Sequence, residues 1–168
     1  MNKRLEQQFI QYVRDNKKQL YLLAYSYVKN EQDALDVVQE SIQKAWQSLH
    51  TLINIEQMKS WLYKIVVRTA IDFLRKMKRI QVMDDETLSY LCEEKYDEYR
   101  DTDLEIALDH LPMQFKEVII LRYFEDLKIE DIAEILSIPL STAKSRLYKA
   151  LKLLKIELDD GGEYYEKK

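Results

Sequence analysis

The sequence predicts an all-α protein made of two small helical domains joined by an acidic linker. Glycine and proline are scarce: the 168 residues include two adjacent glycines near the C-terminus and two prolines, Pro112 and Pro139. Apolar residues recur every three or four positions and do not alternate as they would in half-buried strands. We therefore expect one domain over residues 1–80, a linker over 81–104 and a second domain over 105–168.

Apolar residues at helical spacing run through the start of the chain: Leu5, Phe9, Val13 and Leu20 to Leu23. They predict one or two helices. A further helix is expected over residues 33–46, with Asp33 near its N-cap. The segment from His50 to Ser60 lacks this spacing, so we expect a loop there, with Ser60 as the N-cap of the next helix.

Residues 61–79 show the clearest helical pattern. Apolar side chains form one stripe: Leu62, Ile65, Val66, Phe73 and Met77. Charged side chains recur on another face: Lys64, Arg68, Asp72, Arg75 and Arg79. Such a basic stripe can follow a phosphate backbone, and Trp61 and Tyr63 can stack on unpaired bases. The alternative is that Trp61 belongs to the core and that Asp72 only pairs with Arg75 or Lys76.

The second half of the chain starts after an acidic stretch. Residues 81–110 carry eleven acidic and two basic side chains, which predicts a linker with at most a short helix. A helix is expected to open at Leu111-Pro112 and end near residue 124. A short helix over 129–136, a tight turn over 137–139 and a final helix from 140 to about 158 should follow, and the last ten residues should fray.

Net charge is −4 and would argue against a nucleic-acid binder if it were spread evenly. Residues 1–80, however, carry 14 basic and 8 acidic side chains, and residues 139–155 carry five basic side chains and no acidic one. Two separate helices therefore hold most of the positive charge, which indicates two basic surfaces.

Residues 129–151 carry the strongest local signal. Two short helices joined by a three-residue turn predict a helix-turn-helix, whose second helix enters the major groove of DNA. We expect one exposed face and one buried stripe on that helix: Lys144, Ser145, Tyr148 and Lys149 exposed, and Ala143, Leu147, Leu151 and Leu154 buried. The alternative is an ordinary solvated face of a helical bundle.

Polar residues also share one face of the helix expected over residues 33–46. They are Asp36, Gln39, Glu40 and Gln43. This face is either a docking surface or the solvated side of an amphipathic helix.

The sequence gives little indication of an enzyme or of a membrane protein. Two adjacent glycines cannot make a phosphate-binding loop, and His50 and His110 are isolated, so we expect no catalytic residue, no cofactor and no metal site. The single cysteine, Cys92, excludes an internal disulfide. No apolar run is long enough to span a membrane and the N-terminus has no apolar signal region, so we expect a cytoplasmic protein.

Together and in this order, the segments resemble a bacterial RNA polymerase sigma factor of the extracytoplasmic-function (ECF, group IV) type. The likeness runs from about Leu20 to Leu158. DALDVVQESIQKAW resembles region 2.2, SWLYKIVVRTAIDFLRKMKR resembles regions 2.3 and 2.4, and residues 111–151 resemble region 4. KIVVRTAIDFLRK followed by VMDDET further resembles the sigma-V-like branch.

The resemblance implies a non-enzymatic factor that directs core RNA polymerase to promoters. Polymerase contacts on the beta-prime clamp would come from Asp36, Gln39 and Glu40, while region 4 would also touch the beta flap. Contacts with the −35 duplex would come from Arg122, Lys144, Ser145, Tyr148 and Lys149. Contacts with the −10 element would come from the loop between His50 and Ser60 and from Trp61, Lys64, Arg68 and Arg75.

Family membership further implies an anti-sigma factor, often membrane-anchored, that covers both domains and holds the protein inactive; no small-molecule substrate is implied. The sequence departs from the family at Arg68, where asparagine is common, and at Ser137 and Ser141, where glycine is frequent. Two rivals remain: a dimeric helix-turn-helix repressor, which would bind palindromic duplex without polymerase, and a helical adaptor with no role at DNA.

Overall fold

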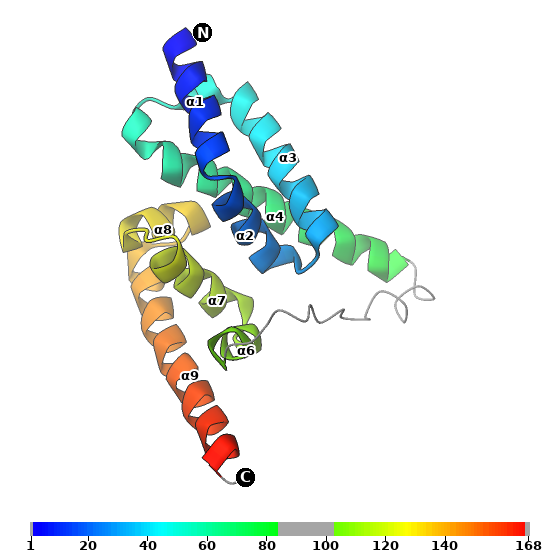
Figure 1. Ribbon diagram of the computed structural model, residues 1–168, viewed down its shortest axis with the longest axis vertical. Coiled ribbons are helices and arrows are strands. Elements are labelled where there is room, and N and C mark those ends of the chain that lie inside the picture. The colour runs from blue at the N-terminus through cyan, green and yellow to red at the C-terminus, as the bar shows by residue number, and fades with distance from the viewer. Residues whose placement is uncertain (1, 84–102, 167–168) are drawn as a thin grey trace. The chain divides into compact units, whose positions relative to one another are not determined.

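The computed structural model describes residues 2–83 and 103–166, and every regular element within those two ranges is helical (Figure 1). The fold class predicted from the sequence is therefore confirmed. The chain divides into two compact units, the first formed mainly by residues up to Met83 and the second mainly by residues after it. Most of the expected acidic linker lies outside the described residues.

The first unit contains four α-helices and two short 3-10 turns among its described residues: α1 (Lys3–Asp15), α2 (Lys17–Val28), α3 (Glu31–Gln47), η1 (Leu49–Thr51), η2 (Ile55–Gln57) and α4 (Met58–Met83). Its core lies where α2, α3 and α4 pack on one another. Leu20, Val37 and Val66, one from each of these helices, are completely buried. Phe9 of α1 is also buried, with its ring centroid 6.1 Å from that of Trp46 and 6.4 Å from that of Trp61.

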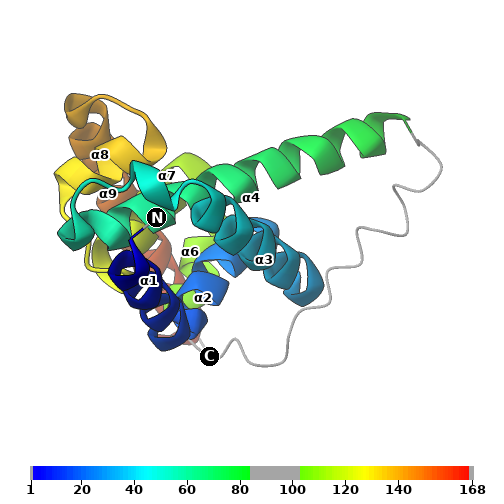
Figure 2. The ribbon, with the colours of Figure 1, turned by 90° about the horizontal axis from the view of Figure 1, so that it is seen from above.

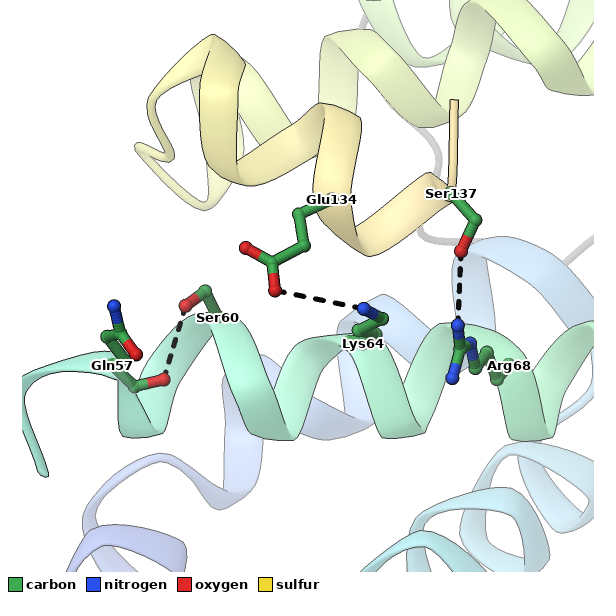
Figure 3. Close-up of polar contacts among 6 residues, drawn as sticks. All are labelled: Gln57, Ser60, Lys64, Arg68, Glu134 and Ser137. Atoms are coloured by element: carbon green, nitrogen blue, oxygen red, sulfur yellow. Dashed lines mark hydrogen bonds and ion pairs between the residues drawn. The ribbon is translucent and has the colours of Figure 1, made fainter. Parts of the chain in front are cut away.

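The starts of two helices differ from the sequence predictions. Helix α3 begins at Glu31, two residues before the expected start at residue 33, and Asn30 is its N-cap, because the Asn30 side-chain oxygen accepts a hydrogen bond from the Asp33 amide at 3.0 Å. Asp33 lies in the first turn, where a carboxylate interacts favourably with the helix dipole. Ser60 lies inside α4 and is no cap, since its hydroxyl donates to the carbonyl of Gln57 at 3.2 Å (Figure 3).

The segment between α3 and α4, expected to be a loop, is more ordered than the sequence predicted. The two 3-10 turns occupy much of it, and Asn54 caps the second by accepting from the amide of Glu56 at 3.0 Å. Leu49, Leu52 and Met58 are buried, so apolar side chains hold the segment against the unit.

The second unit contains α6 (Asp103–His110), α7 (Met113–Ile119), the π-helical turn η3 (Ile120–Phe124), α8 (Ile129–Leu136) and α9 (Leu140–Glu166). Helices α6 and α7 both pack against α9. Pro112 precedes α7, and its carbonyl accepts from the amides of Phe115 and Lys116. The prediction of one continuous helix to residue 124 missed η3, whose wide turn is closed by the Glu125 amide donating to the Ile120 carbonyl at 3.0 Å.

Helix α9 departs from the prediction in its end and in its buried stripe. It runs to Glu166, so the tail expected to fray is helical up to that residue. Ala150 is completely buried, whereas Leu151 is 39% exposed, so Leu151 does not belong to the buried stripe. The core of this unit joins α6, α7 and α9 through Leu108, Leu111, Ile119 and Ala150, with Phe115, Leu147 and Leu154 packed around them.

No helix within the described ranges is both long enough and apolar enough to cross a membrane.

Candidate nucleic-acid interface

The helix-turn-helix is built from α8, the turn over residues 137–139 and the first half of α9. Ala133 of α8 is buried. The amide of Ile138 donates to the Ala133 carbonyl at 3.0 Å, and Ser137 has φ 55°, the left-handed conformation typical of a residue that ends a helix. The predicted short helix and tight turn are thus confirmed.

Four side chains predicted to face DNA are exposed on the first half of α9. Lys144, Ser145 and Lys149 are exposed, and Tyr148 is 69% exposed. The ammonium group of Lys152 lies 5.9 Å from the centre of the Tyr148 ring. This face therefore offers cations, a hydroxyl and an aromatic ring, which are the groups that bind phosphates and base edges.

Arg146, in the middle of this segment, is turned toward the protein. Its guanidinium lies 3.8 Å from the carboxylate of Glu117 on α7, and the Glu117 side chain is 10% exposed. Ser145 and Lys149 line a shallow hollow of about 430 Å³ together with Gln114 and Phe115 of α7. The ion pair therefore holds α9 against α7, whereas Lys144 and Lys149 of α9 face the solvent.

Arg122 lies in the π-helical turn and is half-buried. Its Nη1 atom donates to the carbonyl of Leu127 at 3.0 Å, and its guanidinium carbon lies 5.9 Å from the centre of the Tyr123 ring. One nitrogen of the guanidinium is thus used to fix the turn. The predicted contact with the −35 duplex would have to use the remaining donors.

Helix α4 presents a basic side opposite its buried face. Ser60, Lys64 and Arg68 project from one side of the helix (Figure 3), as expected for a spacing of four residues. Arg68 and Arg75 are exposed and Lys64 is partly buried. Arg75 lies 3.9 Å from Asp72, but both side chains are more than 60% exposed, so this pair contributes little to stability.

The two aromatic residues considered for base stacking differ in accessibility. Tyr63 is 1% exposed, so the prediction that its ring can stack on unpaired bases is wrong. Trp61 is partly buried and packs edge-on against Phe9. That packing agrees with the alternative in which Trp61 contributes to the core, and its contact with the −10 element stays a prediction.

The predicted polymerase-docking face lies on α3. Asp36, Gln39 and Glu40 are all exposed. Glu40 lies 2.7 Å from Lys44 one turn later, and Asp36 accepts from Gln32 at 3.4 Å. Burial, and secondarily the charge of Asp36, raise the pKa of Asp33 above its usual value. The face thus carries two exposed carboxyl groups, Asp36 and Glu40, with Asp33 at its edge.

No group of side chains with the composition of a metal site occurs within the described parts of the chain.

Comparisons with known proteins agree with this arrangement of two helical units. Sigma-70 region 2 matches residues 12–80, and Sigma-70 region 4 matches residues 102–154. The chain is 60% identical over 146 residues to the RNA polymerase sigma factor SigV of Bacillus subtilis (strain 168), covering 87% of this chain and 88% of that protein. It is 28% identical to the ECF RNA polymerase sigma factor SigW of the same organism, covering 86% and 85%.

A solved structure also matches. The sigma factor RpoE in complex with the anti-sigma factor NepR from Bartonella quintana has a TM-score of 0.73 and 25% sequence identity, covering 90% of this chain and 96% of that one. The family and relative matches identify a sigma factor, which is a non-enzymatic transcription factor. The chain belongs to the sigma-70 family, as an ECF sigma factor that directs RNA polymerase to promoters.

Proposed function

We propose that this sigma factor reads the −35 element with the first half of α9 and the −10 element with α4. One observation carries the proposal: Lys144, Ser145, Tyr148 and Lys149 share an exposed face on a helix that has no acidic side chain between residues 139 and 155. In a helix-turn-helix, this half of the second helix is the part that enters the major groove.

At the −35 element, the two lysines supply charge to phosphates or to guanine edges. Ser145 and Tyr148 supply hydroxyl groups to phosphates or bases. Arg122, in the π-helical turn, also binds the −35 duplex, through the guanidinium N–H groups that do not donate to the Leu127 carbonyl. The Glu117–Arg146 pair keeps the angle of α9 constant while these contacts form.

At the −10 element, Lys64, Arg68 and Arg75 of α4 hold the phosphates of the melted strand, with Trp61 and the segment before α4 beside them. Unstacking a base costs a few kcal/mol. Binding at −35 and to the polymerase offsets that cost, because the polymerase holds both domains at a fixed spacing and raises their effective concentration.

The protein contacts involve α3 and the second unit. Asp36, Gln39 and Glu40 dock on the beta-prime clamp, and the second unit touches the beta flap. An anti-sigma factor holds the protein inactive in the cytoplasm, and a membrane anchor on that partner keeps it at the inner face of the membrane. Support for such a partner comes from the similar RpoE, whose solved structure is a complex with the anti-sigma factor NepR.

Run-off transcription with core polymerase tests the division of labour. The Lys144→Ala, Lys149→Ala variant should lose activity on promoters that depend on the −35 element. Each lost base contact should weaken the free energy of promoter binding by roughly 1–3 kcal/mol. The matched control is Lys17→Ala, Lys18→Ala, which removes the same charge from two exposed lysines at the start of α2, away from α9. Equal losses for both variants, or equal losses on random DNA, would contradict base reading by the first half of α9.

A further inference from the structure

Helix α4 continues well beyond the core of its unit. Its 26 residues span about 39 Å. The last completely buried residue along it is Ala70, and most side chains from Arg75 onward are exposed. Figure 2 shows the end of α4 extending past α2 and α3 of the same unit. We call residues 75–82 the outer segment of α4.

The outer segment concentrates positive charge. Arg75, Lys76, Lys78 and Arg79 fall within five positions, and no acidic residue occurs between Asp72 and residue 83. Arg75 is near Asp72, whereas Lys76, Lys78 and Arg79 make no ion pair or hydrogen bond with any other described residue. Arg75 and Arg79 are one turn apart, a spacing at which like charges repel and destabilise a helix. A bound polyanion would remove that cost.

The positions of these cations around and along the helix indicate the shape of the polyanion that would bind them. Successive helical residues are about 100° apart, so the four cations spread over about 160° of the circumference, on the side away from the buried face. Arg68, Arg75 and Arg79 lie nearly in line along that side. Arg68 and Arg79 are about 16 Å apart along the axis, which equals roughly five base pairs of duplex DNA. An extended anion with regularly spaced charges fits this surface better than a compact one.

We propose that Lys76, Lys78 and Arg79 grip the phosphate backbone of the duplex between the −10 and −35 elements, independently of its sequence. The inference rests on the proposed role of Lys64 and Arg68 at the −10 element. If the inner part of α4 lies on the melted strand, its outer segment reaches the adjoining duplex. The upstream side is favoured because the unit proposed to read the −35 element, which lies upstream of −10, follows α4 in the sequence.

The test uses holoenzyme assembled from core polymerase and the full chain, with promoter DNA titrated between about 50 and 200 mM salt. The variant Lys76→Ala, Lys78→Ala, Arg79→Ala removes three exposed cations. The matched control, Arg14→Ala, Lys17→Ala, Lys18→Ala, removes one arginine and two lysines that are exposed at the junction of α1 and α2. Circular dichroism of both variants establishes that they are folded.

The slope of log affinity against log salt should become shallower by about 2 to 3 in the outer-segment variant and stay constant in the control. The loss should be the same on promoters with different −10 and −35 sequences. When uncharged methylphosphonates replace the spacer phosphates next to the −10 element, wild type and variant should bind equally.

Three results would overturn the proposal. One is a slope equal to that of the control. Another is a difference that persists with methylphosphonates upstream but disappears when they are placed downstream of −10. The third is tighter DNA binding by the variant, because its cations would then hold an acidic segment or partner. Any of these results with a retained −35 defect in Lys144→Ala, Lys149→Ala leaves the main functional proposal standing.

Discussion

The ammonium group of Lys116 lies 2.6 Å from a carboxylate oxygen of Asp109, and the Lys116 side chain is only 6% exposed. This ion pair joins α6 to α7. Because α6 has only eight residues, it depends on such tertiary contacts for its stability. The pair therefore helps to complete the core behind the helix that we propose reads −35.

Removing one member of this pair should destabilise the second unit. Asp109→Asn leaves a buried ammonium without its carboxylate, and we expect a loss of about 2–4 kcal/mol, because Asp109 itself is partly exposed. Urea unfolding followed by circular dichroism measures the loss. The double variant Asp109→Leu, Lys116→Met should be more stable than Asp109→Asn, since it also removes the buried ammonium group; a double variant that is less stable would contradict this account.

The buried stripe of α9 can be tested at two adjacent residues. Ala150→Leu forces extra volume into the contact with Leu108, Leu111 and Ile119 and should cost about 1–3 kcal/mol. Leu151→Ala removes a side chain that is 39% exposed and should cost less than about 1 kcal/mol. Thermal unfolding of the two variants compares them. The reverse order would mean that Leu151, as the sequence suggested, faces the core.

Ser137 adopts φ 55° without being glycine. Ser137→Gly should raise the free energy of unfolding by about 0.5–1 kcal/mol, because glycine has no β-carbon to strain the left-handed turn. Ser141→Gly is the matched control: this residue lies in the first turn of α9, so its replacement should reduce stability instead. Calorimetry of both variants measures whether each substitution raises or lowers the free energy of unfolding. An increase in stability at both positions would exclude relief of strain as the cause.

Asp33 should make stability depend on pH. Its pKa in the folded protein is raised, by burial first and by the charge of Asp36 second. The folded state therefore binds more protons than the unfolded state between the usual aspartate pKa and the raised value, and stability falls as pH rises through that window. Asp36→Asn should lower the pKa of Asp33, which NMR titration of the carboxyl group measures. An unchanged pKa would leave burial as the sole cause.

Local patterns were sufficient for most of the helices and for the exposed face of α9. Lysines, serine and tyrosine alternate there with small and apolar residues at helical spacing, and no acidic residue interrupts them. Such a pattern depends on nearest neighbours along the helix, so it can be interpreted without knowing what the helix packs against.

Where two residues close together in the sequence were suited to the same role, the sequence pattern did not show which of them has it. Asn30 and Asp33 are both good N-caps, and the choice depends on the residue at which the backbone leaves the extended conformation. Ala150 and Leu151 are both apolar, and the smaller one is buried because α9 approaches its neighbours closely there. The π-helical turn at η3 has no simple sequence signal.

By itself, the sequence determined the helical class, the helix-turn-helix and the uneven distribution of charge, because each follows from residue types at short spacing. Only the tertiary structure decided that Tyr63 is buried, that Arg146 pairs with Glu117, and that the outer segment of α4 extends past its bundle. These features depend on how much of each helix surface is covered by other helices. That covered area depends on residues far apart in the sequence, so a pattern of neighbouring residues does not contain it.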